Sequence, residues 1–504
     1  MSSKKKKSAS AFEQHGLKKT VDLLLEEIRD LYLSDQIPWV VGYSGGKDST
    51  AILQLIWLAL EGLEPEELKK PIHVISTDTL VENPVVAAWV TASLETIRIA
   101  AADKGLPFMP HRLTPKVTDT FWVNLIGKGY PAPRHMFRWC TERLKINPSN
   151  TFITGVVRES GEAILVLGTR KAESTIRAIN MERHELKRTR ERLSPNSRLP
   201  NSLVFTPIED WSNDDVWIFL MQYRNPWGYD NKNLLTMYQG ASPDGECPLV
   251  VDTTTPSCGD SRFGCWVCTL VDKDKSMQAM IQNDQEKEWM LPLLEFRNKL
   301  DFRDKGERSD RDLRDFRRMG GQVQLFHDDP IPGPYKQSAR EEWLRLLLEA
   351  QAVIRKSDQP GVRDVELITL AELKEIRRIW VVDKHEFEDS LPRIYEEATG
   401  VPFPGEKFDD NLPFGEEEVR ILKDVCGGEE LHFELIRELL DIQRRYNTLS
   451  RRAGLYDDIE KAFKRSFYEG EEDAVSYARE KKDKMRLVHE ARGHLATAEA
   501  KGRA

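Results

Sequence analysis

Residues 43–49 read YSGGKDS and have the composition of a phosphate-binding loop. Two adjacent glycines let the backbone turn sharply and come close to a ligand. Two serine hydroxyls can donate hydrogen bonds, and a lysine adds positive charge. The residues predicted to line the loop are Ser44, Gly45, Gly46, Lys47, Asp48 and Ser49. Asp48 would repel phosphate unless it lies behind the loop or helps to hold Mg²⁺.

The loop differs from two familiar phosphate motifs. A Walker A motif requires Gly at the position of Val41 and Ser or Thr after Lys47, where Asp48 stands. The loop does not follow G-x-G-x-x-G either. It does follow an apolar run at 39–43, a predicted buried strand, and it leads into a predicted helix at 49–63. Free N–H groups and the dipole at the start of that helix attract anions.

Cysteines form the second group of chemically capable residues: Cys140, Cys247, Cys258, Cys265, Cys268 and Cys426. Cys265 and Cys268 make a C-x-x-C pair, and Cys258 lies seven residues before it. In a long chain expected to be cytosolic, such a cluster indicates metal binding or catalysis rather than disulfides. Four thiolates suffice for a [4Fe–4S] cluster or a structural zinc, and a single C-x-x-C pair favours the cluster. Cys426 stands alone and is interpreted as structural.

Strand and helix patterns alternate around the loop. Further strands are predicted at 72–77, 107–113 and 163–169, with a second long helix at 83–105. Strands separated by helices of this length predict a mostly parallel sheet with flanking helices, an α/β fold. Helix patterns dominate the last third of the chain, so a mainly α-helical C-terminal region is expected.

The chain of 504 residues is too long for one ordinary core and predicts two or three domains. The predicted divisions are a disordered basic tail at 1–14, a loop-bearing domain at 15–238, a cysteine-rich loop with a charged connector at 239–335, and a helical domain at 336–504. The net charge of −9 disfavours unspecific coating of nucleic acid but leaves room for a local basic groove.

No apolar run in the sequence approaches the roughly 20 residues that span a bilayer, and the best candidate is 51–60. The basic N-terminus lacks the apolar segment of a secretory signal. A cytoplasmic protein without a membrane partner is therefore expected.

The loop S-G-G-K-D-S resembles the PP-loop of the ATP pyrophosphatase superfamily. In that superfamily the loop holds the pyrophosphate that leaves ATP, and AMP goes to the substrate. Three more stretches, at 76–84, 167–178 and 207–217, resemble segments of the sulfonucleotide reductases within it. The resemblance implies a PP-loop domain and an ATP site.

This resemblance extends the predicted site beyond the loop. Arg170 and Arg177 offer planar forks for phosphate, and Gly168 precedes them. Asp78 lies at the carboxyl end of a predicted strand, where open α/β sheets bind ligands, although a turn or helix-cap role fits it equally. Glu173 fits equally well as a structural partner of either arginine. The predicted catalytic residues are Lys47, Asp48 and Arg170.

The R-W-C and C-x-x-C segments, together with RRMGGQVQLF and IPGPY after residue 316, are similar to the DndC family of DNA phosphorothioation sulfurtransferases over most of the chain. The resemblance implies that ATP is cleaved to AMP and pyrophosphate, and that a non-bridging oxygen of the DNA backbone is replaced by sulfur. It implies a [4Fe–4S] cluster, a cysteine desulfurase as sulfur source and further Dnd proteins as partners. The implied cluster ligands are Cys140, Cys258, Cys265 and Cys268, with Cys247 as a substitute ligand or a sulfur-carrying thiol.

Three other functions stay open at this point. A tRNA thiolase shares the loop and the AMP chemistry. A sulfonucleotide reductase needs a nucleophilic cysteine, usually in a C-terminal tail, whereas nearly eighty residues follow Cys426. A DNA-binding scaffold with an inactive nucleotide site is disfavoured by the intact loop.

Overall fold

The computed structural model describes residues 10–188, 192–242, 263–301, 310–406, 415–447, 449 and 452–501. The chain forms two compact units. Unit 1 comprises residues 1–121, 133–298 and 357–360, and unit 2 comprises residues 122–132, 299–356 and 361–504. The domain boundaries at residues 238 and 335 stay a prediction.

Unit 1 is built on a six-stranded sheet with the order β3-β2-β1-β4-β6-β5. The strands are β1 (Trp39–Gly42), β2 (Ile72–Thr77), β3 (Phe108–Leu113), β4 (Ala163–Val166), β5 (Ser194–Pro195) and β6 (Ser202–Phe205). Every pair is parallel except β5 with β6. The α/β fold with a mostly parallel sheet and its four predicted strands are confirmed, whereas β5 and β6 were not predicted.

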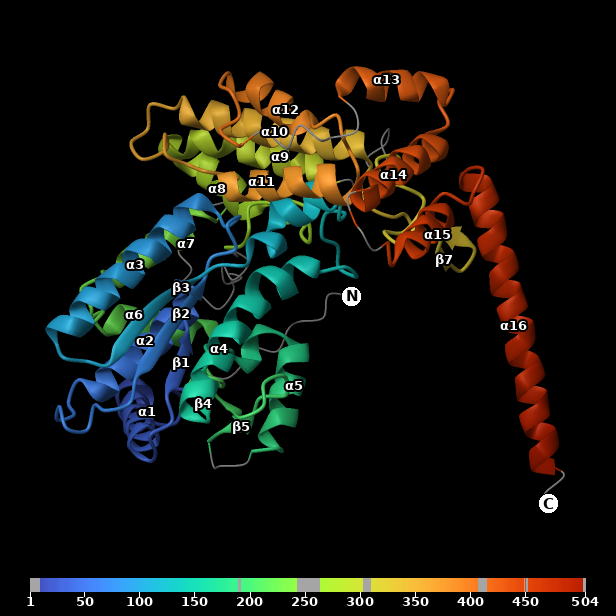
Figure 1. Cartoon of the computed structure of the whole chain (residues 1–504). Helices are drawn as coiled ribbons and strands as arrows, with labels where there is room; N and C mark the ends of the chain where they lie inside the picture. Colours follow the sequence, from blue (N-terminus) through green and yellow to red (C-terminus); the bar gives the residue numbers. More distant parts are fainter. Residues whose placement is uncertain are drawn as a thin grey trace, which may run out of the picture. The chain divides into compact units, whose positions relative to one another are not determined.

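Helices flank the sheet of unit 1 (Figure 1). The helices of unit 1 are α1 (Gly16–Leu33), α2 (Lys47–Leu60), α3 (Pro84–Asp103), α4 (Asn147–Ser160), α5 (Thr175–Glu185), α6 (Asn213–Gln222), α7 (Asn231–Gly240), α8 (Lys275–Asn283) and α9 (Leu291–Leu300), whose last residues belong to unit 2. Short helical turns are η1 (Val117–Asp119), η3 (Thr141–Ile146), η4 (Lys171–Glu173) and η5 (Gln285–Met290).

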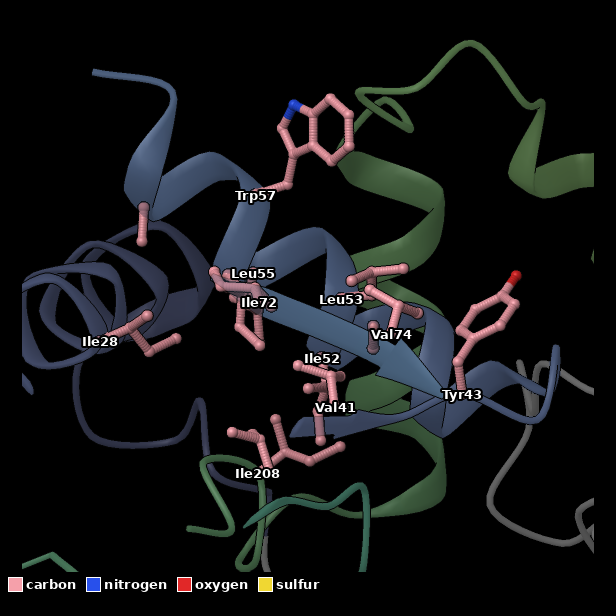
Figure 2. Close-up of a cluster of buried hydrophobic side chains, with 14 of the residues drawn as sticks. Ile28, Val41, Tyr43, Ile52, Leu53, Leu55, Trp57, Ile72, Val74 and Ile208 are labelled. Carbon is pink, nitrogen blue, oxygen red and sulfur yellow. The ribbon is translucent and has the colours of Figure 1, made fainter. Parts of the chain in front are cut away.

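The main core of unit 1 lies between α2 and the sheet. Figure 2 shows side chains of α2, such as Ile52 and Leu53, beside those of β1 and β2. Trp57 stacks on Phe108 of β3 with ring centres 4.8 Å apart. Each aliphatic side chain buried in this way contributes about 1.5–3 kcal/mol, so α2 and the loop before it are held firmly.

The strand order places a topological switch point beside the loop. From β1 the chain crosses to β2 and β3 on one side of β1, and it later returns to β4 on the other side. The connections leave the carboxyl ends of β1 and β4 in opposite directions, which opens a crevice where α/β folds bind ligands. The loop that follows β1 and the segment 167–170 that follows β4 both start at this crevice.

Two expectations from the sequence need correction. Residues 10–14 were assigned to a disordered tail, but Phe12 is buried against Trp211, with ring centres 5.3 Å apart, and the backbone N–H of Ala11 donates to Asp215 at 3.1 Å. The run 51–60 was expected to be the best candidate for a membrane-spanning segment, although too short to span a bilayer. Among the described helices α3 alone is long and apolar enough to cross a membrane, and core helices of soluble proteins also pass this test.

Unit 2 is helical in its described part, apart from the short strands β7 (Leu325–Phe326) and β8 (Asp329–Pro330), so the mainly α-helical C-terminal region is confirmed. Its helices are η2 (Val123–Gly127), α10 (Gln337–Arg355), α11 (Leu370–Arg378), η6 (Ile379–Asp383), α12 (Ser390–Thr399), α13 (Glu416–Val425), α14 (Glu430–Asn447), α15 (Leu455–Arg465) and α16 (Glu471–Lys501). Buried ion pairs join them: Arg340 pairs with Glu386, and Arg317 donates to Glu434 at 2.6 Å.

Candidate active site

The loop after β1 has a backbone that only glycine fits at one position. Gly45 has a φ of +71°, in the left-handed region, and a Cβ there would lie 2.5 Å from Cγ2 of Val90. The indole N–H of Trp89 donates to the Gly45 carbonyl at 3.2 Å. Both contacts come from α3, so this helix fixes the turn from behind. The glycine is required by conformation and by space at the same time.

The N-cap residue of α2 offers no side-chain cap to the backbone N–H groups of the first turn, of which the Lys47 N–H donates to the Tyr238 hydroxyl. Gly46 is the N-cap residue, and it has no side chain to accept from the amides that follow. The Ser49 hydroxyl donates to the Gly46 carbonyl at 3.0 Å and accepts from the Ser44 N–H at 3.2 Å. This arrangement stiffens the loop. The start of the helix, which is the positive end of its dipole, attracts anions.

Asp48 lies behind the loop, which is one of the two placements that the sequence allowed. Its Oδ1 accepts from Nε of Arg170 at 2.7 Å, and its Oδ2 lies 3.0 Å from Nζ of Lys47. Both carboxylate oxygens are therefore engaged in ion pairs. A role of Asp48 in holding Mg²⁺ stays a prediction.

Arg170 is only 4% exposed. Its second guanidinium contact is with the Trp211 carbonyl, to which NH1 donates at 3.2 Å. These contacts hold Arg170 against Asp48, and its contact with phosphate stays a prediction. A Cβ on Gly168 would lie 3.1 Å from the Asp48 carbonyl carbon, so the chain after β4 packs tightly against the loop.

Arg177 and Asp78 stand at the edges of this arrangement. Arg177, at the start of α5, is half exposed and pairs with Glu173, which also accepts from the Arg170 backbone N–H at 3.2 Å. Glu173 thus contacts both arginines. Asp78 accepts from the Leu80 N–H at 2.8 Å and pairs with Arg112 at 3.0 Å, so it makes the turn contact that the sequence offered as an alternative.

Tyr238 on α7 belongs to the site and was missed by sequence reasoning. Its hydroxyl accepts from the Lys47 N–H at 3.4 Å, and Lys47 Nζ lies 5.7 Å from its ring centre. Burial, together with the negative charge of Asp48, raises the pKa of Tyr238, so the hydroxyl stays protonated. Phe263 packs edge-on against Tyr238 with ring centres 4.7 Å apart. No local pattern marks a tyrosine almost two hundred residues away as a partner of the loop.

The C-x-x-C segment starts two residues after Phe263 and docks on the loop between β2 and α3. The Trp266 N–H donates to the Val81 carbonyl at 3.0 Å, and the Thr79 hydroxyl lies 3.3 Å from the Cys265 sulfur. The Cys268 N–H donates to the Cys265 carbonyl at 3.0 Å, which closes a tight turn around the pair. Through Phe263 and Tyr238, the cysteine pair is linked by direct packing to the phosphate loop.

Cys140 joins this pair from the start of η3. Burial is the main cause that raises the pKa of Cys140, and the nearby Cys268 adds to it. Burial also raises the pKa of Cys265 to about 11. The negative charge of a Cys265 thiolate is the main cause that raises the pKa of Lys145, with Glu82 and the other two thiols contributing. Lys145 is therefore close enough to all three sulfur atoms to interact with their charges.

The implied cluster was tested against these residues. Three thiols converge beside a cation and a hydroxyl, an environment that suits an anionic, sulfur-rich group. Within the described ranges, however, no three His, Cys, Asp or Glu side chains are close enough to hold a metal ion. The predicted ligand Cys258 and the alternative Cys247 lie outside the described residues. The donor set thus fits a cluster in type and neighbourhood, with the fourth ligand unassigned by the structure.

Two family models match two different parts of the chain. The family model of the phosphoadenosine phosphosulfate reductase domain matches residues 38–227, which carry the loop and the sheet. The loop-bearing part is therefore similar to the phosphoadenosine phosphosulfate reductase domain. A second family model, described as a small protein found in certain Dnd DNA modification systems, matches residues 417–464, which span α13 to α15.

A curated relative is an uncharacterized protein of Methanocaldococcus jannaschii, 28% identical over 200 residues. The match covers 40% of this chain and 35% of that protein, so the chain spans about a third of its length.

Solved structures of similar proteins are distant. The phosphoadenylyl-sulfate reductase of Candida auris in a phosphate complex is 14% identical, covers 45% of this chain and 93% of its own, and has a TM-score of 0.25. The FMN adenylyltransferase of Candida glabrata in complex with FAD and inorganic pyrophosphate is 11% identical. The match covers 50% of this chain and 78% of that chain, with a TM-score of 0.27. The U34-tRNA thiolase of Methanococcus maripaludis with its [4Fe-4S] cluster is 11% identical. The match covers 58% of this chain and 82% of that chain, with a TM-score of 0.25. TM-scores this low carry no argument about function.

Proposed function

We propose that the chain is an ATP pyrophosphatase that activates a DNA backbone phosphate by adenylation and supports the replacement of a non-bridging oxygen by sulfur. One observation carries the first half: Gly46 leaves the start of α2 uncapped while Arg170 and Lys47 tie Asp48 back, so the loop presents amides to an anion. The match of residues 417–464 to a small protein of Dnd DNA modification systems supports DNA as the substrate.

The chemistry follows from what the loop can hold. A non-bridging phosphate oxygen of DNA attacks the α-phosphorus of ATP, the bond to the β-phosphate breaks, and pyrophosphate leaves into the loop. The amides of α2 and the ammonium group of Lys47 stabilise the charge that develops on this leaving group. Tyr238 and Arg170 act indirectly, because they position Lys47 and Asp48.

Sulfur enters in the second step. A sulfide-level sulfur atom forms a bond to the DNA phosphorus while the bond from phosphorus to the adenylated oxygen breaks. AMP leaves with that oxygen, so a poor leaving group has become a good one. In this proposal a cysteine desulfurase supplies the sulfur as a persulfide, and a thiol reductant releases it as sulfide by giving two electrons and becoming a disulfide. Other Dnd proteins deliver the sulfur or the DNA.

The cysteines are proposed to hold a [4Fe–4S] cluster beside the loop. Cys140, Cys265 and Cys268 would supply three ligands and Cys258 the fourth. When bound, such a cluster would supply redox-active iron and sulfide. Lys145 balances the negative charge of the thiolates, and the Thr79 hydroxyl donates to the Cys265 sulfur.

The test is the fate of the ATP phosphates. Purified protein with DNA, ATP, Mg²⁺ and a sulfur source is expected to release pyrophosphate and AMP in equal amounts. The Lys47→Ala variant should lower this release about a hundredfold, because it removes a charge that meets the leaving group. Release of orthophosphate without pyrophosphate would end the proposal.

A sulfonucleotide reductase is the second candidate, because residues 38–227 match that reductase domain. This reaction needs a cysteine that is a thiolate at neutral pH. Sulfite release from phosphoadenosine phosphosulfate would favour the reductase, and loss of thio-nucleosides from tRNA in a deletion strain would favour a tRNA thiolase.

A further inference from the structure

Exposed aromatic side chains gather in one short stretch of unit 2. Of the aromatic side chains that the structure describes, six are exposed, and four of these lie between residues 456 and 477. These four, hereafter the aromatic surface, are Tyr456 (84% exposed) and Phe463 (51%) on α15, Phe467 (65%) just after it, and Tyr477 (45%) on α16. Large exposed apolar groups that gather in this way mark a site of interaction.

The four rings lie within reach of one another. Tyr456 and Phe463 are seven residues apart on α15, so two turns of the helix put them on the same face. Phe467 follows Phe463 by four residues, which span at most about 14 Å. Its ring centre lies 5.7 Å from that of Tyr477. The aromatic surface therefore fits within the contact area of one protein partner.

The other side of α15 is fixed to α14. The Tyr446 hydroxyl of α14 donates to Asp458 at 3.0 Å, and Arg465 pairs with Glu438 of α14. Ala462, between these two contacts, is buried. Turning the aromatic face of α15 inward would break all three contacts. The rings are thus presented on a fixed element, and aromatic side chains lose little conformational entropy when they bind.

The charge around the aromatic surface argues against nucleic acid as its partner. Exposed rings can stack on bases, but such sites also need a positive groove. Residues 456–477 contain seven acidic and three basic residues, a net charge of −4. Of the three basic residues, Arg465 is held in its ion pair with Glu438. The surface that complements this stretch is apolar and basic, as on a protein partner.

The segment that carries two of the four rings is similar to a Dnd protein. Tyr456 and Phe463 fall within residues 417–464, which match the small protein found in certain Dnd DNA modification systems. We infer that the aromatic surface docks another protein of a Dnd modification system, through an apolar patch rimmed by lysine and arginine on that protein. This inference rests on the proposed function, and it names the surface through which the chain meets its partner.

The experiment measures binding of the full chain to each of the other Dnd proteins of its system, purified and fluorescently labelled. Tyr456→Ser with Phe463→Ser removes two rings of the aromatic surface. This variant should bind one Dnd protein about a hundredfold more weakly, because buried aromatic anchors dominate interface energies. Phe326→Ser with Val353→Ser is the matched control, since these side chains of unit 2 are also exposed, at 67% and 57%. The control should bind as wild type does.

A second variant tests the charge of the surface. Asp457→Asn with Glu460→Gln removes two exposed carboxylates of α15. It should weaken binding of the same Dnd protein about fivefold at low salt and make binding less sensitive to added salt, because charges at a rim steer association. Every substituted side chain is exposed, so all variants should keep the thermal unfolding midpoint of wild type.

Equal affinities of the aromatic and control variants for every Dnd protein would overturn the inference, and so would a wild-type chain that binds none of them. Loss of self-association or of duplex DNA binding in the aromatic variant, with Dnd protein binding intact, would overturn it as well. Dnd protein binding that the aromatic variant loses, together with a wild type that releases no pyrophosphate, would uphold the surface and refute the proposed function. Pyrophosphate release by a wild type that binds no Dnd protein would do the reverse.

Discussion

The phosphate loop and the cysteine group lie in the same unit and are linked through Tyr238 and Phe263. The two sites are built in different ways. The loop is fixed by contacts with neighbouring elements: Gly45 is wedged against α3, and both oxygens of Asp48 are in ion pairs. The three described thiols of the cysteine group come near one another but do not meet at ligand distance. The phosphate site is thus built mainly from one loop and the first turn of one helix, whereas the thiols come from segments more than a hundred residues apart in the sequence.

The first prediction tests whether the phosphate loop is preorganised, by distorting its backbone. Gly45→Ala places a Cβ 2.5 Å from Val90 in a left-handed backbone conformation, so the loop must shift. Pyrophosphate release should fall by on the order of a hundredfold, since preorganised donors lose their alignment. Gly62→Ala is the matched control, because a Cβ there meets nothing within 4 Å. Equal losses in both variants would show that the loop is not preorganised.

The cysteine group is tested by iron content. Cys265→Ser should lower the iron of anaerobically purified protein to background, because it removes one member of the only C-x-x-C pair. Cys426→Ser should keep the wild-type amount, since Cys426 lies at the end of α13 in unit 2. A colourless wild-type protein that contains zinc would contradict the cluster assignment.

A smaller effect is expected for the ion pair that holds Asp48 against Arg170, and its measure is the coupling energy of the two side chains. The Asp48–Arg170 pair can be isolated by a double-mutant cycle with Asp48→Ala, Arg170→Ala and the double variant, using urea unfolding. Because Arg170 is buried, we expect a coupling energy of about 1–3 kcal/mol. Asp35 and Lys70, which are paired at 2.9 Å elsewhere in unit 1, provide a second cycle for comparison. A coupling near zero for Asp48 and Arg170 would mean that Asp48 is free for another partner.

The smallest effect concerns the sheet that carries both regions. His73 of β2 and His111 of β3 lie 3.1 Å apart between ring nitrogens, and burial lowers the pKa of each below 6.5. The unfolded chain therefore takes up protons first as the pH falls. Their contribution to stability is complete above pH 6.5 and is lost as the pH falls from there through the lowered pKa values. The drop in urea midpoint from pH 7.5 to 5.5 should be smaller in a His73→Gln, His111→Gln variant.

The sequence was most informative where the physics is local. The glycine pair, the apolar run before it and the strand–helix alternation predicted the loop, its position and four strands, because each depends on neighbouring residues. It was least informative where partners are distant: the contact of Tyr238 with Lys47 and the nearness of Lys145 to three thiols depend on how whole elements pack. Arg170 illustrates the limit, since its type predicted a phosphate contact but did not predict its ion pair with Asp48.

The central claim is that a DNA phosphate oxygen is adenylated, and oxygen labelling tests it most directly. DNA whose non-bridging phosphate oxygens carry ¹⁸O is incubated with the protein, its partner proteins, ATP and a sulfur source, and the AMP is analysed by mass spectrometry. The account predicts one ¹⁸O atom in AMP for each phosphorothioate formed, because AMP leaves with the displaced oxygen. AMP without ¹⁸O, formed alongside phosphorothioate, would contradict it.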